Sequence, residues 1–339
     1  MRKVLVTGGA GFIGSNFTRL LLERHPDYQV TVLDALTYAG RRENLADLES
    51  RNAIRFVHGD IRDVDVVNGL VGDHDAIVHF AAETHNDRSI MEAGDFISTD
   101  VHGTFVLLEA ARKHGVERFV HISTDEVYGD ALDGPSKETS PLNPKSPYSA
   151  SKAGADRLAY SYYETFGVPV VISRCTNNYG PYQYPEKLIP LFLTNLLIGL
   201  RVPVYGSGGN TRDWIHVLDH CDAVDLLLHD SGHLGEVFNI STGVELSILD
   251  VTERLLSILG LGRELIQMVT DRPGHVVAHS VDSENFRREF SWEPAFEFEQ
   301  GLRDTAQWYQ SNVAWWKAIR DSSEEFRRYY AQQYAELGS

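Results

Sequence analysis

The sequence contains few cysteines and no long hydrophobic run. Its 2 cysteines, Cys175 and Cys221, lie in apolar segments without the CxxC or Cys/His spacing of a zinc site or a disulfide framework. We therefore expect a reducing, cytoplasmic location and no metal. The apolar run at residues 4–6 is too short for a signal-peptide core. The longest apolar stretch, residues 188–200, is interrupted by polar residues, proline and glycine, so no segment reaches the ~20 apolar residues that span a bilayer.

Positive charge is also scarce. The chain has 31 Lys and Arg against 48 Asp and Glu, a formal net charge of −17. This surplus repels phosphate backbones and anionic lipids, and no run of five like charges supplies a local basic patch. We therefore expect no nucleic-acid partner and no membrane-surface role. The 339 residues, 42% of them hydrophobic, are typical of a globular protein with one large or two modest domains.

Short β-rich runs alternate with helical patterns over the first half of the chain. The runs are residues 3–7, 29–33, 54–58, 76–80, 118–123 and 168–175. Apolar residues at three and four spacing predict helices over 15–24 and 103–114. This alternation predicts an α/β protein with a Rossmann-type, doubly wound parallel sheet.

The alternation weakens after about residue 180, where loop signals appear. We expect residues 1–180 to form an NAD-binding Rossmann domain, with a return segment near 213–242. Residues 181–339 are expected to form mainly a smaller, interleaved, mixed α/β domain that binds the substrate. Tryptophans and tyrosines near the end indicate helices with aromatic faces, which suit core packing or a subunit contact.

A glycine-rich turn follows the first predicted strand and opens a helix. It reads Gly9-Ala10-Gly11-Phe12-Ile13-Gly14, and free backbone N–H groups at such a helix start bind a dinucleotide pyrophosphate. Asp34 ends the second strand, 20 residues beyond Gly14. A carboxylate there binds the adenine ribose and repels a 2′-phosphate, which favours NAD over NADP. Arg41 and Arg42 argue the other way, since a nearby arginine accommodates that phosphate.

Reactive side chains gather around the end of the fifth predicted strand. Tyr148 and Lys152 are four residues apart, on one face of a predicted helix. A lysine ammonium and a cationic nicotinamide would stabilise the tyrosine phenolate. Thr124, Asp125 and Glu126 end the strand, and strand ends of such sheets face the ligand crevice. Because adjacent carboxyls repel, we expect one of the two to hold its proton, as an acid/base pair requires.

Further segments complete a family pattern: residues 81–83, 87–90, 177–181, 186–190, 212–214 and 271–275. Together with the glycine turn, the Thr-Asp-Glu triplet and the Tyr/Lys pair, they resemble the dTDP-glucose 4,6-dehydratases of the extended short-chain dehydrogenase/reductase family. The resemblance runs from residue 1 to about residue 316. The triplet is its most specific part, because epimerases of the superfamily typically carry small or hydroxyl residues in place of Asp125 and Glu126.

The resemblance implies conversion of dTDP-glucose to dTDP-4-keto-6-deoxyglucose and water. Tyr148, oriented by Lys152 and Thr124, would take the 4-hydroxyl proton while the carbon-4 hydride passes to NAD. The resulting ketone acidifies the carbon-5 hydrogen, which Glu126 would remove, and Asp125 would protonate the departing 6-hydroxyl. The hydride then returns to carbon 6. NAD is therefore expected to be tightly bound and regenerated in each cycle.

The resemblance also implies contacts and an assembly state. The expected cofactor contacts are Gly8, Gly11, Phe12, Ile13, Gly14, Asp34, Leu36, Thr37, Asp60, Ile61, Ala81, Ala82, Thr99, Tyr148, Lys152 and Asn178. The expected sugar-nucleotide contacts are Thr84, Thr124, Asn177, Lys187, Leu188, Pro203, Tyr205, Arg212, Asn239, Arg272 and His275. A homodimer is expected from the family.

The sequence departs from the family's usual Glu-Ser-His-Val-Asp-Arg-Ser at Thr84 and Asn86. We expect Thr84 to preserve a substrate hydrogen bond and Asn86 to be tolerated at the pocket edge. The alternatives are another nucleoside-diphosphate-sugar 4,6-dehydratase, a sugar-nucleotide epimerase or decarboxylase that uses only the Tyr/Lys pair and NAD, and a non-catalytic NAD-binding module. The adjacent carboxyls favour the dehydratase, whereas no residue pattern identifies the nucleotide base.

Overall fold

The computed structural model describes residues 2–271, 275–322 and 324–333, and a seven-stranded parallel sheet forms its centre. The strand order is β10-β6-β5-β4-β1-β2-β3. The strands are β1 (Lys3–Thr7), β2 (Gln29–Asp34), β3 (Ile54–His58), β4 (Ala76–His79), β5 (Arg118–Thr124), β6 (Val170–Cys175) and β10 (Val237–Ile240). All neighbours pair in parallel, which confirms the predicted Rossmann-type sheet.

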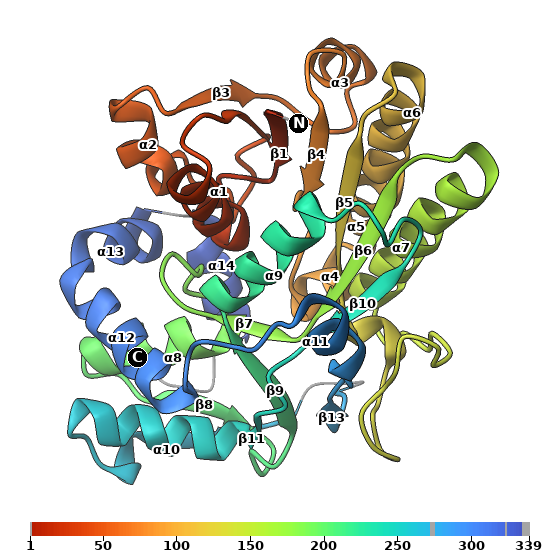
Figure 1. Cartoon of the computed structure of the whole chain (residues 1–339). Helices are drawn as coiled ribbons and strands as arrows, with labels where there is room; N and C mark the ends of the chain where they lie inside the picture. Colours follow the sequence, from red (N-terminus) through yellow and green to blue (C-terminus); the bar gives the residue numbers. More distant parts are fainter. Residues whose placement is uncertain (1, 272–274, 323, 334–339) are drawn as a thin grey trace.

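Helices cover both faces of this sheet (Figure 1), so its central strands are apolar on both sides. On one face, Val4 and Val6 pack in a core with α1 (Phe12–Arg24) and α9 (Val217–His229). On the other face, Leu5 packs in a core with α3 (Val64–Val71), α6 (Thr104–His114) and α7 (Pro147–Phe166). The sheet therefore receives α9 and β10 from the part of the chain that follows residue 213.

Helix α7 has strong sequence signals at both ends. Ser146 caps its first turn in a reciprocal capping box with Ser149, and Pro147 occupies the first helical position. Gly167 ends the helix with φ 69°, in the left-handed region that glycine favours. These signals fix the start of the helix and therefore the position of Tyr148.

A further hydrophobic core, separate from the cores on the two faces of the sheet, lies beside the carboxyl ends of the strands. It is built on the helices α8 (Leu188–Leu197), α10 (Ile248–Leu259), α12 (Phe298–Ser311) and α13 (Val313–Ser322). Figure 1 shows these helices together at one end of the molecule, with α3 at the opposite end. Trp316 is 1% exposed in this core, so it serves internal packing.

Two small sheets contribute residues to this further core or lie beside it. Strand β8 (Val202–Tyr205) pairs with β12 (Ile266–Val269), and β9 (Thr211–His216) pairs with β7 (Asn177–Tyr179), β11 (Glu245–Ser247) and β13 (Ala278–His279). The remaining elements are η1 (Arg42–Leu45), α2 (Ala46–Ser50), α4 (Asn86–Met91), α5 (Ala93–Phe96), the π-helix η2 (Ile97–Gly103), η3 (Asp125–Tyr128), η4 (Arg263–Leu265), α11 (Glu284–Phe290) and α14 (Glu324–Gln333). Within the described ranges, every helix is too short or too polar to cross a membrane.

Candidate active site

Two adjoining cavities open at the carboxyl edge of the parallel sheet, where α/β proteins of this type bind ligands. The first, about 300 Å³, contains the Thr-Asp-Glu triplet. The second, about 240 Å³, follows the glycine turn. Thr84, Tyr148 and Lys187 line both cavities and therefore mark their junction.

The glycine turn is shaped by close backbone contacts. Gly8 has φ +70°, and a Cβ there would lie 2.5 Å from the backbone nitrogen of Ala81. A Cβ on Gly14 would lie 2.4 Å from the carbonyl oxygen of Gly8. Helix α1 begins directly after the turn without a side-chain cap, so its first N–H groups can meet an anion.

Asp34 supports this turn from the end of β2. Its carboxylate accepts hydrogen bonds from the backbone N–H of Ala10, at 2.9 Å, and of Leu36, at 2.8 Å. Burial raises the pKa of Asp34 above its usual value, although these two hydrogen bonds oppose the shift. Asp34 therefore shapes the cavity that it lines.

Most of the residues expected to contact the cofactor line the second cavity. They are Gly8, Gly11, Phe12, Ile13, Gly14, Asp34, Thr37, Asp60, Ile61, Ala81, Ala82, Thr99, Tyr148 and Lys152. Asn178 lines the first cavity instead. Leu36 is not a lining residue of either cavity, and its N–H is bound to Asp34.

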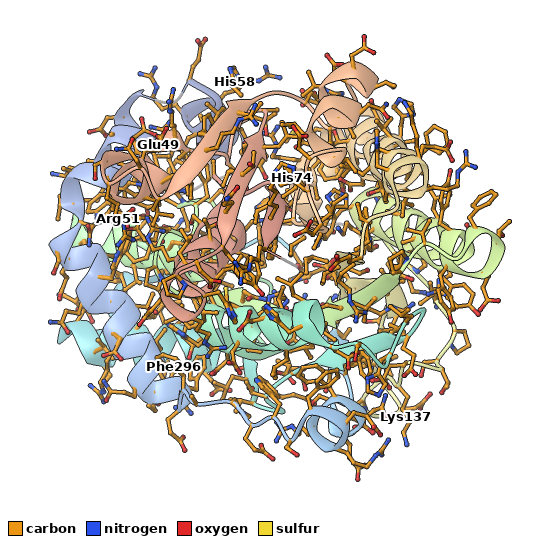
Figure 2. The ribbon with its side chains drawn as sticks, turned by 45° about the horizontal axis from the view of Figure 1, so that its top comes forward. Glu49, Arg51, His58, His74, Lys137 and Phe296 are labelled. Carbon is orange, nitrogen blue, oxygen red and sulfur yellow. The ribbon has the colours of Figure 1, made fainter. Side chains whose placement is uncertain are left out.

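The two arginines that argued for NADP are directed elsewhere. Arg42 pairs with Glu49 at 2.9 Å, and Figure 2 labels Glu49 on α2. Arg41 pairs with Glu43 at 3.3 Å. Neither arginine lines the second cavity, whereas Asp34 does. Arg62 also lines this cavity, and its guanidinium pairs with Asp60 at 2.6 Å.

Tyr148 and Lys152 both lie on α7. Burial raises the pKa of Tyr148 well above its ordinary value, the charges of Glu126 and Asp100 add to this, and a hydrogen bond with Thr124 opposes it. Nζ of Lys152 donates to the carbonyl oxygen of Ile122 at 2.7 Å. Among the chain's own groups desolvation therefore prevails at Tyr148, and the expected stabilisation of its phenolate by Lys152 together with a bound nicotinamide stays a prediction.

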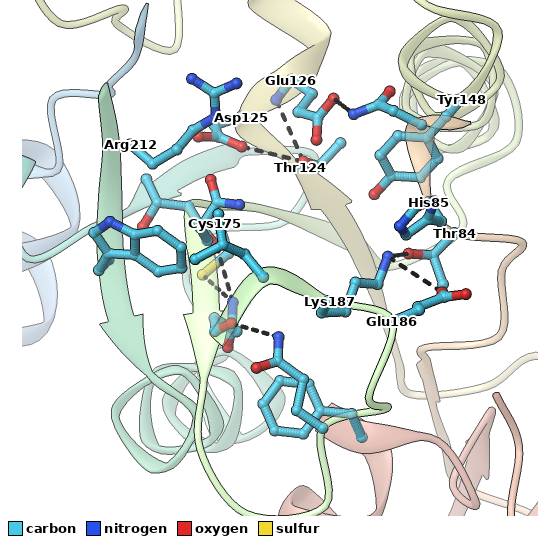
Figure 3. A pocket seen from close by; sticks show the side chains of 18 of the residues that line it. Thr84, His85, Thr124, Asp125, Glu126, Tyr148, Cys175, Glu186, Lys187 and Arg212 are labelled. Atoms are coloured by element: carbon cyan, nitrogen blue, oxygen red, sulfur yellow. Dashed lines mark hydrogen bonds and ion pairs between the residues drawn. The ribbon is translucent and has the colours of Figure 1, made fainter. Parts of the chain in front are cut away.

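The carboxyl pair behaves as its adjacency predicted. Burial raises the pKa of Asp125 to about 8, and the charges of Glu126 and Asp213 contribute. Asp125 therefore holds a proton at neutral pH. Its Oδ1 accepts a hydrogen bond from the Thr124 hydroxyl at 3.2 Å, whereas its buried Oδ2 has no hydrogen-bond partner among the described residues. Figure 3 shows Asp125 between Arg212 and Glu126.

One basic group, Lys187, lies across the first cavity from the triplet (Figure 3), whereas Arg212 lies beside Asp125. Lys187 precedes α8, and its Nζ donates to Oγ1 of Thr84 at 2.9 Å and lies 3.9 Å from Oε1 of Glu186 (Figure 3). Burial lowers the pKa of Lys187, and the charge of Glu186 opposes this. Thr84 thus keeps a hydroxyl in the cavity, as its replacement of serine predicted.

Comparisons with known proteins agree with this geometry. A family model described as GDP-mannose 4,6 dehydratase matches residues 5–305. The chain is 52% identical to a dTDP-glucose 4,6-dehydratase of Streptomyces niveus, over 95% of this chain and 97% of that protein. The chain belongs to the dTDP-glucose 4,6-dehydratase family.

Solved structures show the same likeness and its limits. DesIV, a dTDP-glucose 4,6-dehydratase of Streptomyces venezuelae crystallised with NAD bound, is 50% identical with a TM-score of 0.91, covering 94% of this chain and 99% of that one. A UDP-glucose 4-epimerase of Thermus thermophilus in complex with NAD is 32% identical with a TM-score of 0.85, covering 92% of this chain and 100% of that one. The scaffold is therefore shared by dehydratases and epimerases, and the residues of the site must separate them.

Most of the sugar-nucleotide contacts that resemblance to the dehydratase family assigned line the first cavity. They are Thr84, Thr124, Asn177, Lys187, Leu188, Pro203, Tyr205, Arg212 and His275. Arg272 lies outside the described residues. The structure places Asn239 elsewhere, and that assignment is corrected.

Asn239 is fully buried on β10, away from the cavity. Its Oδ1 accepts from the hydroxyl of Tyr128 at 2.8 Å, and its Nδ2 donates to the carbonyls of Ser136 and Asp282. These bonds use the polar atoms of the amide to join three segments. Asn239 therefore supports the walls of this dehydratase-family site without reaching its interior.

Sequence reasoning missed several polar residues of the site. Burial raises the pKa of Asp213 to about 6, and its charge acts on Asp125. Asp100 accepts from the backbone N–H of Glu83 at 2.7 Å and shifts the pKa of both Tyr148 and Lys152. Asp213 lies in residues 212–214, which read Arg-Asp-Trp and form part of the family resemblance, so the sequence offered a signal for it. No local sequence pattern points to Asp100.

Asn86 was expected to be a tolerated substitution, but its side chain is bonded within the site. Its Nδ2 donates to Oε2 of Glu126 at 2.8 Å, and its Oδ1 accepts from the hydroxyl of Ser146 at 2.6 Å.

One group of metal-ligating side chains lies outside the site. His25, Asp225 and His229 present ligand atoms within 4.8 Å of one another. Arg24 donates to the same carboxylate, Asp225, at 3.1 Å, and Nδ1 of His229 lies 2.8 Å from the carbonyl oxygen of Asp225. A cation and hydrogen bonds already engage this group, so we interpret it as an ion-pair cluster between α1 and α9.

Proposed function

We propose that this chain dehydrates dTDP-glucose to dTDP-4-keto-6-deoxyglucose, with NAD as a tightly bound cofactor that is regenerated in each cycle. The observation that carries the proposal is the protonated, buried carboxyl of Asp125, which lines the first cavity and whose Oδ2 has no hydrogen-bond partner among the described residues. An epimerase that uses only a Tyr/Lys pair has no need of such an acid. Thymidine is favoured because two relatives at about half identity, from Streptomyces niveus and Streptomyces venezuelae, are dTDP-glucose 4,6-dehydratases.

The residues present fit NAD. The glycine turn leaves space that a Cβ would fill, and the start of α1 offers N–H groups. Asp34 lines the cavity at the expected ribose end, and Arg62, which also lines it, is paired with Asp60 at 2.6 Å. When bound, NAD supplies a hydride acceptor for carbon 4, a hydride donor for carbon 6 and a positive charge beside Tyr148. We propose that the lining residues of the second cavity hold it.

Tyr148 is proposed to take the proton of the 4-hydroxyl. The Thr124 hydrogen bond favours its phenolate form and orients the ring toward the triplet. Lys152 fixes the helix that carries Tyr148, since its ammonium is bonded to the carbonyl of Ile122 on β5. The phenol oxygen is thereby held at the junction of the two cavities.

Glu126 and Asp125 are proposed to divide the elimination of water. Glu126 takes the carbon-5 proton, and the electron pair of the broken C–H bond becomes the second bond between carbons 5 and 6. The bond between carbon 6 and its oxygen then breaks as Asp125 gives its proton to that oxygen, which leaves as water. The proton that Asp125 holds at neutral pH is the one this step consumes.

Lys187, Arg212 and His275 are proposed to meet the diphosphate of the substrate. All three line the first cavity, and a buried ammonium forms strong, charge-assisted hydrogen bonds with phosphate oxygens. Residues 1–180 with the return segment 213–242 are proposed to form the NAD-binding domain, and the rest of 181–339 the sugar-nucleotide domain. The core on one face of the parallel sheet and the separate core built on α8, α10, α12 and α13 support this division.

We also propose a homodimer and a cytoplasmic location. Phe105 on α6 and Phe166 on α7 are 40% and 51% exposed, as expected of a face that a second copy covers. Size-exclusion chromatography with light scattering tests the dimer. Cys175 and Cys221 are free and buried, which suits a reducing compartment and is tested by cell fractionation.

Mass spectrometry of the product tests the reaction. The purified protein is incubated separately with dTDP-glucose, UDP-glucose and CDP-glucose, without added reductant or oxidant. The proposal predicts loss of one water molecule from dTDP-glucose. A product of unchanged mass but altered stereochemistry identifies an epimerase instead, and faster loss of water from UDP- or CDP-glucose overturns the assignment of thymidine.

A further inference from the structure

Asn86 connects two parts of the site that are separate in the sequence. It is the first residue of α4, and its amide lies between Glu126, which follows β5, and Ser146, which caps α7. The bond from its Nδ2 to Glu126 is 2.8 Å long, and the bond to its Oδ1 from Ser146 is 2.6 Å long. One amide therefore bridges the carboxylate after β5 and the cap of the helix that carries Tyr148.

The orientation of this amide follows from its neighbours. The hydroxyl oxygen of Ser146 accepts from the backbone N–H of Ser149 at 3.1 Å, so its proton can point at Asn86. A carboxylate only accepts hydrogen bonds, so the amide nitrogen must face Glu126. Both ends of Asn86 thus agree on one orientation, in which an N–H of the amide is directed at Oε2 of Glu126.

The backbone before Asn86 is strained in a way that fixes its direction. His85 has φ 99° and ψ 114°, a conformation that residues with side chains rarely adopt. Ser89 holds the turn, because its N–H donates to the carbonyl of His85 at 3.1 Å and its hydroxyl to that of Asn86 at 2.7 Å. Strained backbone that its surroundings hold in place is common where a side chain must be aimed.

Glu126 and Asn86 also separate two cavities. Both residues line the first cavity and a further cavity of about 250 Å³, which Ser146 and Ile90 line as well. A valine at position 86, usual in the family that the sequence resembles, would maintain this partition sterically. It could not donate to Glu126, so the two side chains differ in chemistry while both can fill the wall.

We propose that Asn86 is a positioning residue for Glu126: its amide holds the carboxylate in the direction needed for removal of the carbon-5 proton, and fixes its position relative to the Ser146 cap of α7. The inference rests on the proposed function, in which Glu126 is the carbon-5 base. It replaces the view that Asn86 is merely tolerated.

The test compares Asn86→Val and Asn86→Asp with the wild type, and with Ile90→Ala as a control from the same helix and cavity. Cofactor reduction in a single turnover, product formation and deuterium uptake at carbon 5 are measured on the full chain with its cofactor. Thermal melting confirms that each variant is folded.

Asn86→Val is expected to slow product formation and deuterium uptake about 10- to 100-fold, the effect of losing one charge-assisted hydrogen bond. Cofactor reduction should stay within about 2-fold, because Tyr148 and not Glu126 serves that step. Asn86→Asp should slow product formation and deuterium uptake at least as much, because a carboxylate at position 86 offers no N–H donor to Glu126. Ile90→Ala should match the wild type.

Wild-type rates of product formation and deuterium uptake in Asn86→Val would overturn the inference, and so would equal slowing of both half-reactions. Both outcomes leave the proposed function intact, because the wild type still forms product. Absence of dehydration by the wild type would instead refute the proposed function.

Discussion

Lys152 donates a hydrogen bond from Nζ to the carbonyl oxygen of Ile122, two residues before Thr124 on β5. This bond joins the helix that carries Tyr148 to the strand that carries the carboxyl pair. The lysine therefore ties Tyr148, proposed to act at carbon 4, to the carboxyl pair proposed to act at carbons 5 and 6.

Replacing Lys152 with methionine removes this bond while keeping the length of the side chain. We expect cofactor reduction in a single turnover to slow by about 100-fold, the cost of a misplaced reacting group. Lys113→Met, on the exposed surface of α6, serves as the control and should leave the rate unchanged. A normal rate of cofactor reduction in Lys152→Met would contradict the role given to this bond.

The glycine turn provides a matched pair of substitutions. Gly14→Ala would bring a Cβ to 2.4 Å from the carbonyl oxygen of Gly8, whereas Gly11→Ala would bring one to only 3.2 Å from the same atom. We therefore expect Gly14→Ala to lose most of the bound NAD and Gly11→Ala to retain more. Cofactor released from the denatured protein measures both, and the opposite order would refute this reading of the turn.

The pH at which Asp125 loses its proton predicts where product formation falls on the alkaline side. Because the pKa of Asp125 is raised to about 8, its acid form is abundant below that pH and is lost as the pH rises through it. Product formation should therefore fall on the alkaline side of about pH 8 while cofactor reduction persists. Asp125→Asn should slow product formation about 10²- to 10⁴-fold at all pH values. An alkaline limb that persists in this variant would exclude Asp125 as its source.

Features of this site that depend on residues close together in the chain could be predicted from the sequence, whereas features that depend on residues far apart in the chain could not. The glycine turn, the capped start of α7 and the strand-end triplet follow from local patterns, and the parallel sheet brings them to one edge. Asn239 was misplaced because its burial depends on Tyr128, more than a hundred residues away in the chain.

Asn86 and Lys152 show the same limit in the active site itself. The contact of Asn86 with Glu126 requires the unusual backbone of His85, which no local pattern announces. The pair of Tyr148 and Lys152 was located correctly on one helix face, yet the ammonium is engaged by Ile122. Spacing along a helix predicts which residues are neighbours, but tertiary contacts decide what each of them binds.

A buried ion pair behind the site offers a test of stability. Arg174 donates to Asp156 at 2.8 Å and to the hydroxyl of Tyr128 at 2.7 Å. Asp156→Ala leaves a buried cation without its partner and should lower the free energy of unfolding by about 3–5 kcal/mol. Glu49→Ala, which breaks a more exposed pair with Arg42, should change it much less. Urea denaturation compares the two, and equal effects would contradict the importance of burial.

The central claim is that one site oxidises carbon 4 and eliminates water across carbons 5 and 6. Its most direct test is the reaction of dTDP-glucose in deuterated water, followed by NMR of the product. The account predicts a 4-keto-6-deoxy sugar with a methyl group at carbon 6 and solvent deuterium at carbon 5, because Glu126 exchanges its proton with solvent before carbon 5 is reprotonated. A product that keeps its hydroxymethyl group at carbon 6 would contradict the account.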